Sequence, residues 1–288
     1  MRRALGTAQF GLDYGIANSE GKVLPTSARN IISFAKNNKI AVIDTARSYG
    51  DSEECLGSVG MEGLNVITKL PPLPSSCADT GAWVANQVAD SLKMLQITQL
   101  YGVLLHRPLD LLSESGSQLY KHLQSLKGNG LARKIGVSIY TPDELSLLSK
   151  RYQFDIVQSP FNVIDRRLST SGWLKRLSDT GVEIHTRSAF LQGLLLIAPN
   201  RIPEQFKPWR LLWQEWHNWL ADQNTSAVQA CLGFVDSFKE IEQVIVGVQS
   251  CQQLYEIIQS PEWKPSTDWP NIGCDDERLI NPSLWGSR

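Results

Sequence analysis

Three short runs of the sequence decide the fold: Ala41-Val-Ile-Asp44, Asn65-Val-Ile-Thr-Lys69 and Leu100-Tyr-Gly-Val-Leu-Leu-His106. Each run is rich in Val, Ile and Leu, and longer stretches with helical periodicity separate them. Runs this apolar are typical of strands that are covered on both faces of a parallel sheet. The same pattern recurs along the chain, so strands are predicted over 4–8, 41–44, 65–69, 100–106, 134–138, 156–158, 182–187 and 243–246.

Helices are predicted between these strands, and several have recognisable ends. Thr26, Thr141-Pro142 and Ser250 mark helix starts, whereas Asn129-Gly130 and Thr180-Gly181 mark helix ends. The predicted helices cover 26–38, 52–60, 80–95, 116–128, 142–151, 170–180, 226–237 and 250–259. Eight βα units in about 250 residues match the size of a closed (β/α)8 barrel of the α/β class. A doubly wound open sheet is the alternative, but no Gly-x-Gly-x-x-Gly motif follows the first strand.

One domain is expected over residues 1–288, with the barrel itself over about 4–259. Two segments fall outside the repeat. The stretch 192–225 extends the seventh βα unit and contains a predicted helix in which Trp209, Leu212, Trp213, Trp216 and Leu220 share one face. We expect this face to pack on the barrel. The tail, 260–288, is rich in Pro and Trp and is predicted to be an irregular extension that folds over one mouth of the barrel.

The charge balance argues against nucleic acid and membranes as partners. The chain has 28 basic and 29 acidic residues, which gives a net charge of -1 and no strongly basic surface. No run reaches the roughly 20 apolar residues of a spanning helix, and no signal-peptide pattern opens the chain, so a cytoplasmic protein is expected. The five cysteines form no Cys-x-x-Cys pair and the four histidines no His-Glu-x-x-His motif, so neither disulfides nor a metal site are predicted.

Ionisable residues stand at the carboxyl ends of three predicted strands. Asp44, Lys69 and His106 close the second, third and fourth runs, and Tyr49 follows Asp44 in the next loop. Catalytic groups of a (β/α)8 barrel come from these strand ends. The four side chains are therefore expected to converge at one mouth.

This combination of side chains suits the protonation of a carbonyl oxygen. A tyrosine hydroxyl with a pKa near ~10 is a weak acid at neutral pH, and a nearby ammonium such as Lys69 is expected to lower that pKa. Asp44 would keep the ammonium charged, and a neutral His106 imidazole would donate a hydrogen bond to the substrate oxygen. The residues predict a site that protonates a ketone or aldehyde while another group supplies hydride.

The segment from Asp44 to Gly57, Asp-Thr-Ala-Arg-Ser-Tyr-Gly-Asp-Ser-Glu-Glu-Cys-Leu-Gly, resembles the first motif of the aldo/keto reductase family. Lys69 and His106 occupy the remaining places of the family's Asp-Tyr-Lys-His tetrad. Weaker matches lie at 5–7, 136–138, 158, 188–193 and 247–250, so the resemblance covers about 4–258. It implies a (β/α)8 barrel and reversible NAD(P)H-dependent carbonyl reduction, with Asp44, Tyr49, Lys69 and His106 as the catalytic residues.

The resemblance also assigns residues to a cofactor, NADP(H). Ser138 and Gln158 match positions that bind the nicotinamide carboxamide, and Arg187 stands where many members place a ring that stacks on the nicotinamide. Glu256 fits the position that recognises the adenine amino group. The other residues implied are Gly6, Thr7, Asp44, Ser188, Phe190, Gly193, Gly247, Gln249, Ser250 and Gln253. Because 247–256 holds no Lys or Arg for the 2′-phosphate, we expect NAD(H) to bind as well, with NADPH preferred by no more than about tenfold.

Two other functions stay open. A non-catalytic barrel could bind a nucleotide as a sensor or regulatory subunit, although such a protein needs no complete tetrad. A lyase or isomerase could use Lys69 for a Schiff base, which leaves the matches at Ser138, Gln158 and Ser188 without a role. The leading hypothesis is an oxidoreductase for a small aldehyde, ketone or sugar-like substrate, acting as a monomer or weak homo-oligomer.

Overall fold

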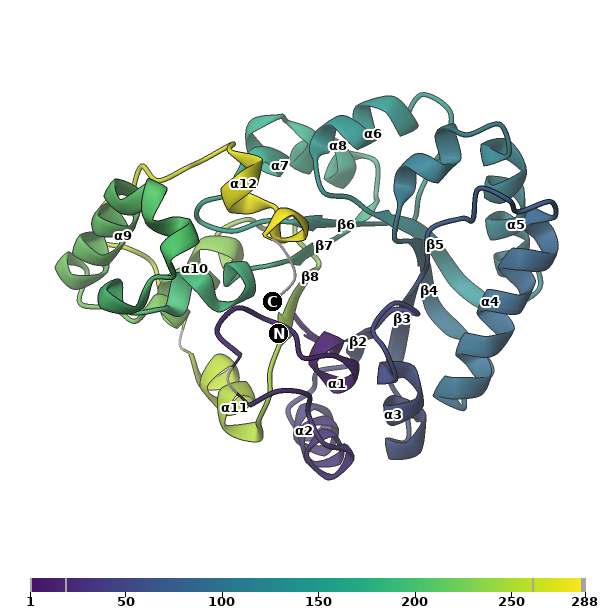
Figure 1. Ribbon diagram of the computed structural model, residues 1–288, viewed down its shortest axis with the longest axis horizontal. Coiled ribbons are helices and arrows are strands. Elements are labelled where there is room, and N and C mark those ends of the chain that lie inside the picture. Colours follow the sequence, from purple (N-terminus) through teal and green to yellow (C-terminus); the bar gives the residue numbers. More distant parts are fainter. Residues whose placement is uncertain (1, 19, 261, 286–288) are drawn as a thin grey trace.

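Eight parallel strands close into a barrel, and each strand pairs with its neighbours in sequence order (Figure 1). The computed structural model describes residues 2–18, 20–260 and 262–285. Its strands are β1 (Arg3–Gly6), β2 (Val42–Asp44), β3 (Asn65–Leu70), β4 (Leu100–Leu105), β5 (Ala132–Ser138), β6 (Ile156–Pro160), β7 (Glu183–Arg187) and β8 (Gln243–Gly247). Pairing of β1 with β8, with Gly6 opposite Gly247, closes the ring. The predicted (β/α)8 barrel is therefore confirmed.

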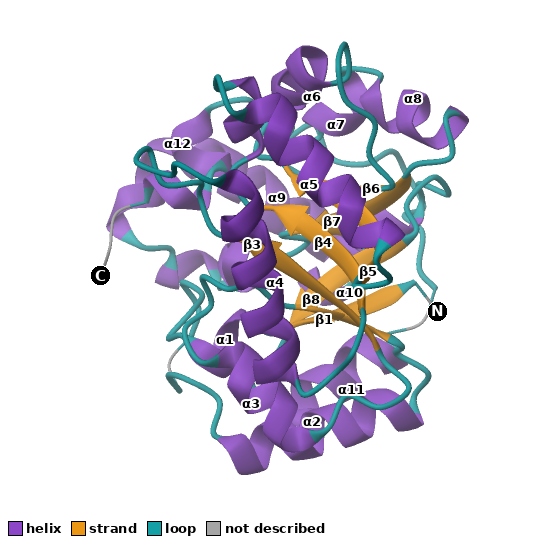
Figure 2. Ribbon diagram, turned by 90° about the vertical axis from the view of Figure 1, so that its right-hand side faces the viewer, coloured by secondary structure: helices purple, strands orange, loops and turns teal. Residues whose placement is uncertain are grey.

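Helices surround the strands, as the side view shows (Figure 2). Those that follow the strands are α2 (Pro25–Asn37), α3 (Ser52–Val59), α4 (Thr80–Leu95), α5 (Gly116–Gly128), α6 (Pro142–Leu148), α8 (Trp173–Asp179), α10 (Ala227–Asp236) and α11 (Cys251–Gln259). Local side chains fix several starts: Thr141 with Glu144 and Ser226 with Gln229 form capping boxes, and Ser250 caps α11. The additional elements are α1 (Ala8–Gly11), α7 (Arg167–Thr170), α9 (Arg210–Asp222), α12 (Glu277–Ile280), η1 (Pro108–Leu112), η2 (Leu191–Leu196), η3 (Pro199–Arg201), η4 (Glu204–Trp209) and η5 (Pro282–Leu284).

The structure corrects several boundaries: the helix predicted over 142–151 ends at Leu148, and the strand predicted over 134–138 begins at Ala132. The first strand was expected to reach residue 8, but it ends at Gly6 because the chain turns into the short helix α1. The helix expected over 170–180 begins only at Trp173, as α8, and the short helix α7 ends at Thr170 before it. Gly172 lies between them with a φ of 79°, a left-handed conformation that interrupts a right-handed helix.

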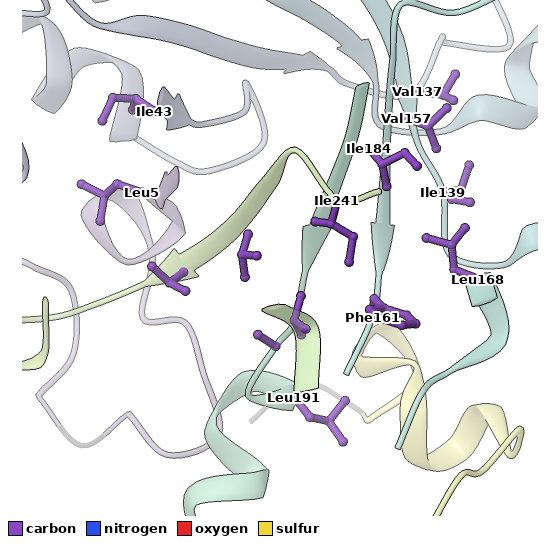
Figure 3. Close-up of a cluster of buried hydrophobic side chains, with 14 of the residues drawn as sticks. Leu5, Ile43, Val137, Ile139, Val157, Phe161, Leu168, Ile184, Leu191 and Ile241 are labelled. Atoms are coloured by element: carbon purple, nitrogen blue, oxygen red, sulfur yellow. The ribbon is translucent and has the colours of Figure 1, made fainter. Parts of the chain in front are cut away.

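Alternation along the strands separates two apolar layers. The outer layer lies between barrel and helices and includes Leu5, Ile43, Val137, Val157 and Ile184 (Figure 3). The inner cluster consists of Ala4, Val42, Ile67, Leu104, Ile156 and Ile245. Successive side chains of a strand point to opposite faces, so residues two positions beyond the inner cluster also face the interior, nearer the carboxyl mouth. These residues include Asp44, Lys69 and Gln158.

The extended seventh unit and the tail build a lobe beside the barrel. Trp213, Trp216 and Leu220 of α9 are buried, and Trp209 and Leu212 pack partly buried against the same core, which confirms the predicted face. In Figure 1, α12 lies between this lobe and α7.

The tail packs on the lobe and along the barrel's carboxyl end. Trp263 contacts Trp219 with ring centroids 5.8 Å apart, and Trp269 contacts Phe234 at 5.2 Å. The backbone N–H of Cys274 donates to the Ile164 carbonyl at 3.0 Å, in the loop that leaves β6. Residues 261 and 286–288 of the predicted tail lie outside the described part of the chain. In the part that is described, no helix has both the length and the apolar character needed to cross a bilayer.

Candidate active site

An ion pair between β2 and β3 lies inside the barrel, at the end where the carboxyl ends of the strands open. The Lys69 Nζ lies 2.7 Å from Oδ2 of Asp44 and donates to the Thr45 carbonyl at 2.8 Å. The same nitrogen lies 3.4 Å from the Tyr49 hydroxyl oxygen. Lys69 is fully buried, and burial lowers its pKa against the opposing effect of the Asp44 carboxylate. The ammonium therefore connects a carboxylate to a phenol.

A second chain of hydrogen bonds holds Asp44 from the other side. The Gln158 Nε2 donates to Oδ1 of Asp44 at 2.7 Å, and the Ser138 hydroxyl bonds to Gln158 Oε1 at 3.1 Å. Both carboxylate oxygens are thus occupied, which fixes the carboxylate plane. Ser138 and Gln158 were expected to bind a nicotinamide carboxamide, but here their polar groups bond to each other and to Asp44, and neither lines the cavity described below.

The loop that carries Tyr49 is held tightly by the loop after β1. A Cβ added to Gly11 would lie 1.7 Å from the Tyr49 carbonyl oxygen, so only glycine fits there. The Ser52 hydroxyl, one turn later, donates to the Thr7 carbonyl at 2.9 Å. These contacts give the Tyr49 ring one position above Lys69.

The net pKa of Tyr49 is raised, whereas the sequence led us to expect that Lys69 would lower it. Burial, followed by the Asp44 carboxylate, raises the pKa of Tyr49, and the Arg187 guanidinium opposes this only in part. Burial of the ring and the Asp44 carboxylate together outweigh the Arg187 guanidinium, because both disfavour the charged phenolate. Tyr49 is therefore protonated, which is the state that a proton donor requires.

His106 follows the last residue of β4 and contacts Tyr49 edge to face, with ring centroids 5.9 Å apart. Burial lowers the pKa of His106 to about 3, and the charges of Lys69 and Arg187 lower it further in the same direction. The imidazole is neutral at physiological pH, as we expected from the sequence. The structure brings Asp44, Tyr49, Lys69 and His106 into one connected cluster.

A cavity of about 330 Å³ extends from Tyr49 to α11. Its volume lies within the ~300–1,000 Å³ of typical ligand sites. Of the residues implied in cofactor binding, those that line it are Gly6, Thr7, Asp44, Arg187, Ser188, Phe190, Gly193, Gly247, Gln249, Gln253 and Glu256. Residues that are 250 positions apart in sequence therefore face one continuous space.

Glycines keep the walls of the cavity close together. A Cβ on Gly247 would lie 2.6 Å from the Gln9 side chain, and one on Gly193 would lie 2.6 Å from Ala17. Gly193 also has a φ of 90°, which favours glycine. The loop after β1 thereby approaches the loops after β7 and β8 across the cavity.

The far end of the cavity is the start of α11. The Ser250 hydroxyl accepts from the backbone N–H of Gln253 at 3.2 Å, and Gln253 Oε1 accepts from the backbone N–H of Gln249 at 2.8 Å. The side chains that line this end, Gln249, Gln253, Glu256 and Ile257, include no cation among the described residues. Glu256 Oε1 accepts from Gln252 Nε2 at 3.0 Å.

Tyr14 and Tyr140 belong to the site. Neither was named as a site residue from the sequence, although the loop 10–14 was expected to contribute to substrate specificity. Tyr14 lines the cavity from the loop after β1, and the Tyr140 ring lies 4.7 Å from the Arg187 guanidinium carbon. Tyr140 follows β5 by two positions and Tyr14 follows β1 by eight, and this location after a strand is the signal that could have found them. Aromatic residues in such loops are too common for the spacing alone to select these two.

Comparisons with known proteins agree with this architecture. The model of the aldo/keto reductase family matches residues 4–268. The aldo-keto reductase AKR11C1 from Bacillus halodurans, in its holo form, superposes with a TM-score of 0.73 at 21% identity, covering 92% of this chain and 88% of that one. The glycerol dehydrogenase AKR11B4 from Gluconobacter oxydans gives 0.69 at 20% identity, covering 96% and 88%. A comparison with curated protein sequences gives no match.

The solved structures share the barrel fold with this chain, and the family model spans nearly all of it. The chain belongs to the aldo/keto reductase family, whose members are typically NAD(P)H-dependent oxidoreductases.

Proposed function

We propose that this protein is an NADP(H)-dependent oxidoreductase that interconverts a small carbonyl compound and its alcohol. The observation that carries the proposal is the position of Lys69 Nζ, 2.7 Å from Asp44 and 3.4 Å from the Tyr49 hydroxyl, beneath a cavity that reaches α11. An ion pair placed below a protonated phenol suits proton transfer to a carbonyl oxygen. The substrate class is an aldehyde, a ketone or a sugar-like compound.

The residues of the cavity fit an extended dinucleotide. Gly6, Gly193 and Gly247 leave room where a side chain would close the space, and α11 begins at the end remote from Tyr49. Backbone N–H groups at a helix start attract phosphate, and Gln249, Ser250 and Gln253 stand there with neutral donors. Arg187, Ser188 and Phe190 would hold the nicotinamide end, and Glu256 the adenine. When bound, the cofactor supplies hydride to the substrate carbon.

The chain's own side chains handle the proton. The Tyr49 oxygen accepts from Lys69, so its proton is free to be donated to a substrate oxygen. The neutral His106 ring, packed against Tyr49, would donate a second hydrogen bond to that oxygen and orient the carbonyl. As Tyr49 loses its proton, the developing negative charge faces Lys69, whose ammonium stabilises it.

Titration of the protein's tryptophan fluorescence with NADPH and NADH, followed by turnover of a panel of aldehydes, ketones and sugars, tests the proposal. Saturable cofactor binding and cofactor oxidation by at least one class of substrate are expected. Absence of cofactor binding would contradict the proposal. Tight binding without turnover of any compound would favour the non-catalytic sensor instead.

A further inference from the structure

Arg187 is a cation in the cavity, and none of the residues that the structure describes is its acidic partner. It ends β7 and lines the same space as Tyr49. Its Nη2 donates to the Ile139 carbonyl at 3.0 Å, and its Nη1 lies 3.5 Å from the Ser188 hydroxyl. In the described part of the chain, no carboxylate lies within ion-pair distance of this guanidinium, although the ring of Tyr140 covers it at 4.7 Å.

Three other cations near this mouth are paired with carboxylates, whereas Arg166 bonds to the Val163 and Pro270 carbonyls. Lys69 pairs with Asp44 at 2.7 Å, Arg167 pairs with Asp165 at 2.9 Å, and Arg107 pairs with Asp110 at 2.5 Å. These three pairs cancel, whereas Arg187 lies near the proposed proton donor with no carboxylate of the described residues in ion-pair distance. Arg187 is partly buried, and a ligand anion in the cavity would compensate its charge.

Tyr14 supplies a second donor from the opposite wall. Its hydroxyl oxygen accepts from Gln192 Nε2 at 3.1 Å, which leaves the hydroxyl proton free to be donated. Burial raises the pKa of Tyr14 to about 12, so the hydroxyl is protonated throughout the physiological range. Arg187 and Tyr14 therefore present one charged and one neutral donor to the same cavity.

We propose that Arg187 and Tyr14 bind a carboxylate of the substrate, so that the preferred substrate is an oxo acid. This inference rests on the proposed function and deepens it. Arg187 and Tyr49 both act electrostatically on Tyr14, so the three groups lie at one end of the cavity. This suits a carboxylate within a few bonds of the carbonyl that Tyr49 protonates, as in a 2-oxo or 3-oxo acid. The planar guanidinium matches a carboxylate through its N–H edge, which leaves its face available for stacking.

Calorimetric titration with oxamate, an unreactive analogue of a 2-oxo acid, tests the site directly. Oxamide is the uncharged control, and inorganic phosphate tests whether the site binds phosphate rather than a carboxylate. Each compound is titrated with and without saturating NADPH. Oxamate is expected to bind at least tenfold more tightly than oxamide, and Arg187→Gln to weaken oxamate by about 10–100-fold. Equal affinity for oxamate and oxamide, or binding of phosphate alone, overturns the proposal.

A matched variant excludes a general effect of losing an arginine. Arg176→Gln removes a guanidinium that also stacks on an aromatic ring, Trp173 at 4.4 Å, but lines a different cavity, so oxamate affinity should stay within about twofold of the parent. Arg187→Lys keeps the charge and should recover part of the lost affinity. If Arg187→Gln binds oxamate as the parent does, Arg187 is not the anion site.

Kinetics separate this inference from the proposed function. The ratio of kcat/KM for an oxo acid to that for its uncharged amide should fall by about 10–100-fold in Arg187→Gln. Failure of the parent to bind NADPH would refute the oxidoreductase, while the oxamate titration of the cofactor-free protein still reports on the anion site. Normal NADPH binding together with an unchanged ratio would refute only the anion site.

Discussion

The ammonium of Lys69 lies 2.7 Å from the carboxylate of Asp44, and both side chains are at least nine-tenths buried inside the barrel. Register explains the contact: Asp44 is opposite Ile67 on the adjacent strand, so Lys69 is two positions further along the same inward face. Each charge is compensated only by the other and by a few hydrogen bonds. The removal of either partner would leave an uncompensated charge in the interior.

Lys69→Met is therefore expected to reduce the free energy of unfolding by about 3–5 kcal/mol, because Asp44 loses its counter-charge. Urea denaturation measures the change. The double variant Asp44→Asn/Lys69→Met removes both charges and should recover much of the loss. Lys175→Met, which breaks an exposed pair with Asp179, is the control and should change little. A fully stable Lys69→Met protein would contradict the buried ion pair.

Tyr49→Phe should lower carbonyl reduction by ~10²–10⁴-fold, because the proposed proton donor is lost while the ring remains. The dissociation constant for NADPH should stay within a few-fold of the parent value, since the ring still fills its place in the wall of the cavity. Steady-state rates and fluorescence titration measure the two quantities. Tyr120→Phe is the matched control, because its hydroxyl bonds to the Gln153 carbonyl outside the cavity. Turnover above half of the parent rate in Tyr49→Phe would exclude the proposed role.

NADPH should be preferred over NADH by no more than about tenfold, since the α11 end of the cavity offers neutral donors to a 2′-phosphate. Gln253→Arg should raise the preference, because charge-assisted hydrogen bonds to phosphate are stronger than neutral ones. Gln259→Arg, at the far end of α11, is the control. Parallel dissociation constants measure both. A preference above about a hundredfold in the parent would show that a cation reaches the phosphate from elsewhere.

Deletion of residues 261–288 should change folding stability or substrate KM more than it changes cofactor binding. Trp269 packs on Phe234 and the Pro270 carbonyl accepts from Arg166 at 2.6 Å, so the tail supports the loop after β6 rather than the α11 end. Trp269→Ala should reduce the free energy of unfolding by about 1–3 kcal/mol, because the ring is only partly buried. Leu284→Ala, at a position that is 56% exposed, is the control. A truncated protein with parental stability and kinetics would make the tail dispensable.

Glu183→Gln should make unfolding less sensitive to acid. Burial opposes ionisation of Glu183, but the His185 ring, Lys134 and Tyr101 outweigh it and lower the pKa to about 2. Because the ordinary pKa is 4.5, this network contributes its full stability above that pH and loses it as the pH falls towards 2.

Urea midpoints at neutral pH and near pH 2 measure this effect. The parent protein should exceed Glu183→Gln in stability at neutral pH, and the difference should shrink in acid. Glu204→Gln, in an ion pair where Glu204 is 84% exposed, is the control and should show little difference at either pH. A difference for Glu183→Gln that is independent of pH would contradict the lowered pKa.

The alternation of apolar runs and helical periodicity by itself determined the barrel and the order of its strands. Local patterns were sufficient to predict these elements. A strand covered on both faces and a capped helix each have a recognisable sequence pattern within about ten residues. The positions of Asp44, Lys69 and His106 at strand ends likewise predicted their convergence, since parallel strands bring their carboxyl ends together. Gly172 was the exception among the helices, because a glycine in helical surroundings does not reveal a positive φ.

Only the tertiary structure decided the electrostatics of the site and the use of each polar group. The sequence suggested that Lys69 lowers the pKa of Tyr49, but burial and Asp44 raise it, and neither effect can be computed without distances. The attachment of Gln158 to Asp44 and the approach of Tyr14 to the cavity join residues more than a hundred positions apart. The unpaired state of Arg187 depends on which carboxylates fold towards it. Such contacts depend on how the eight strands and their loops pack when the barrel closes. Short-range sequence patterns do not predict this packing.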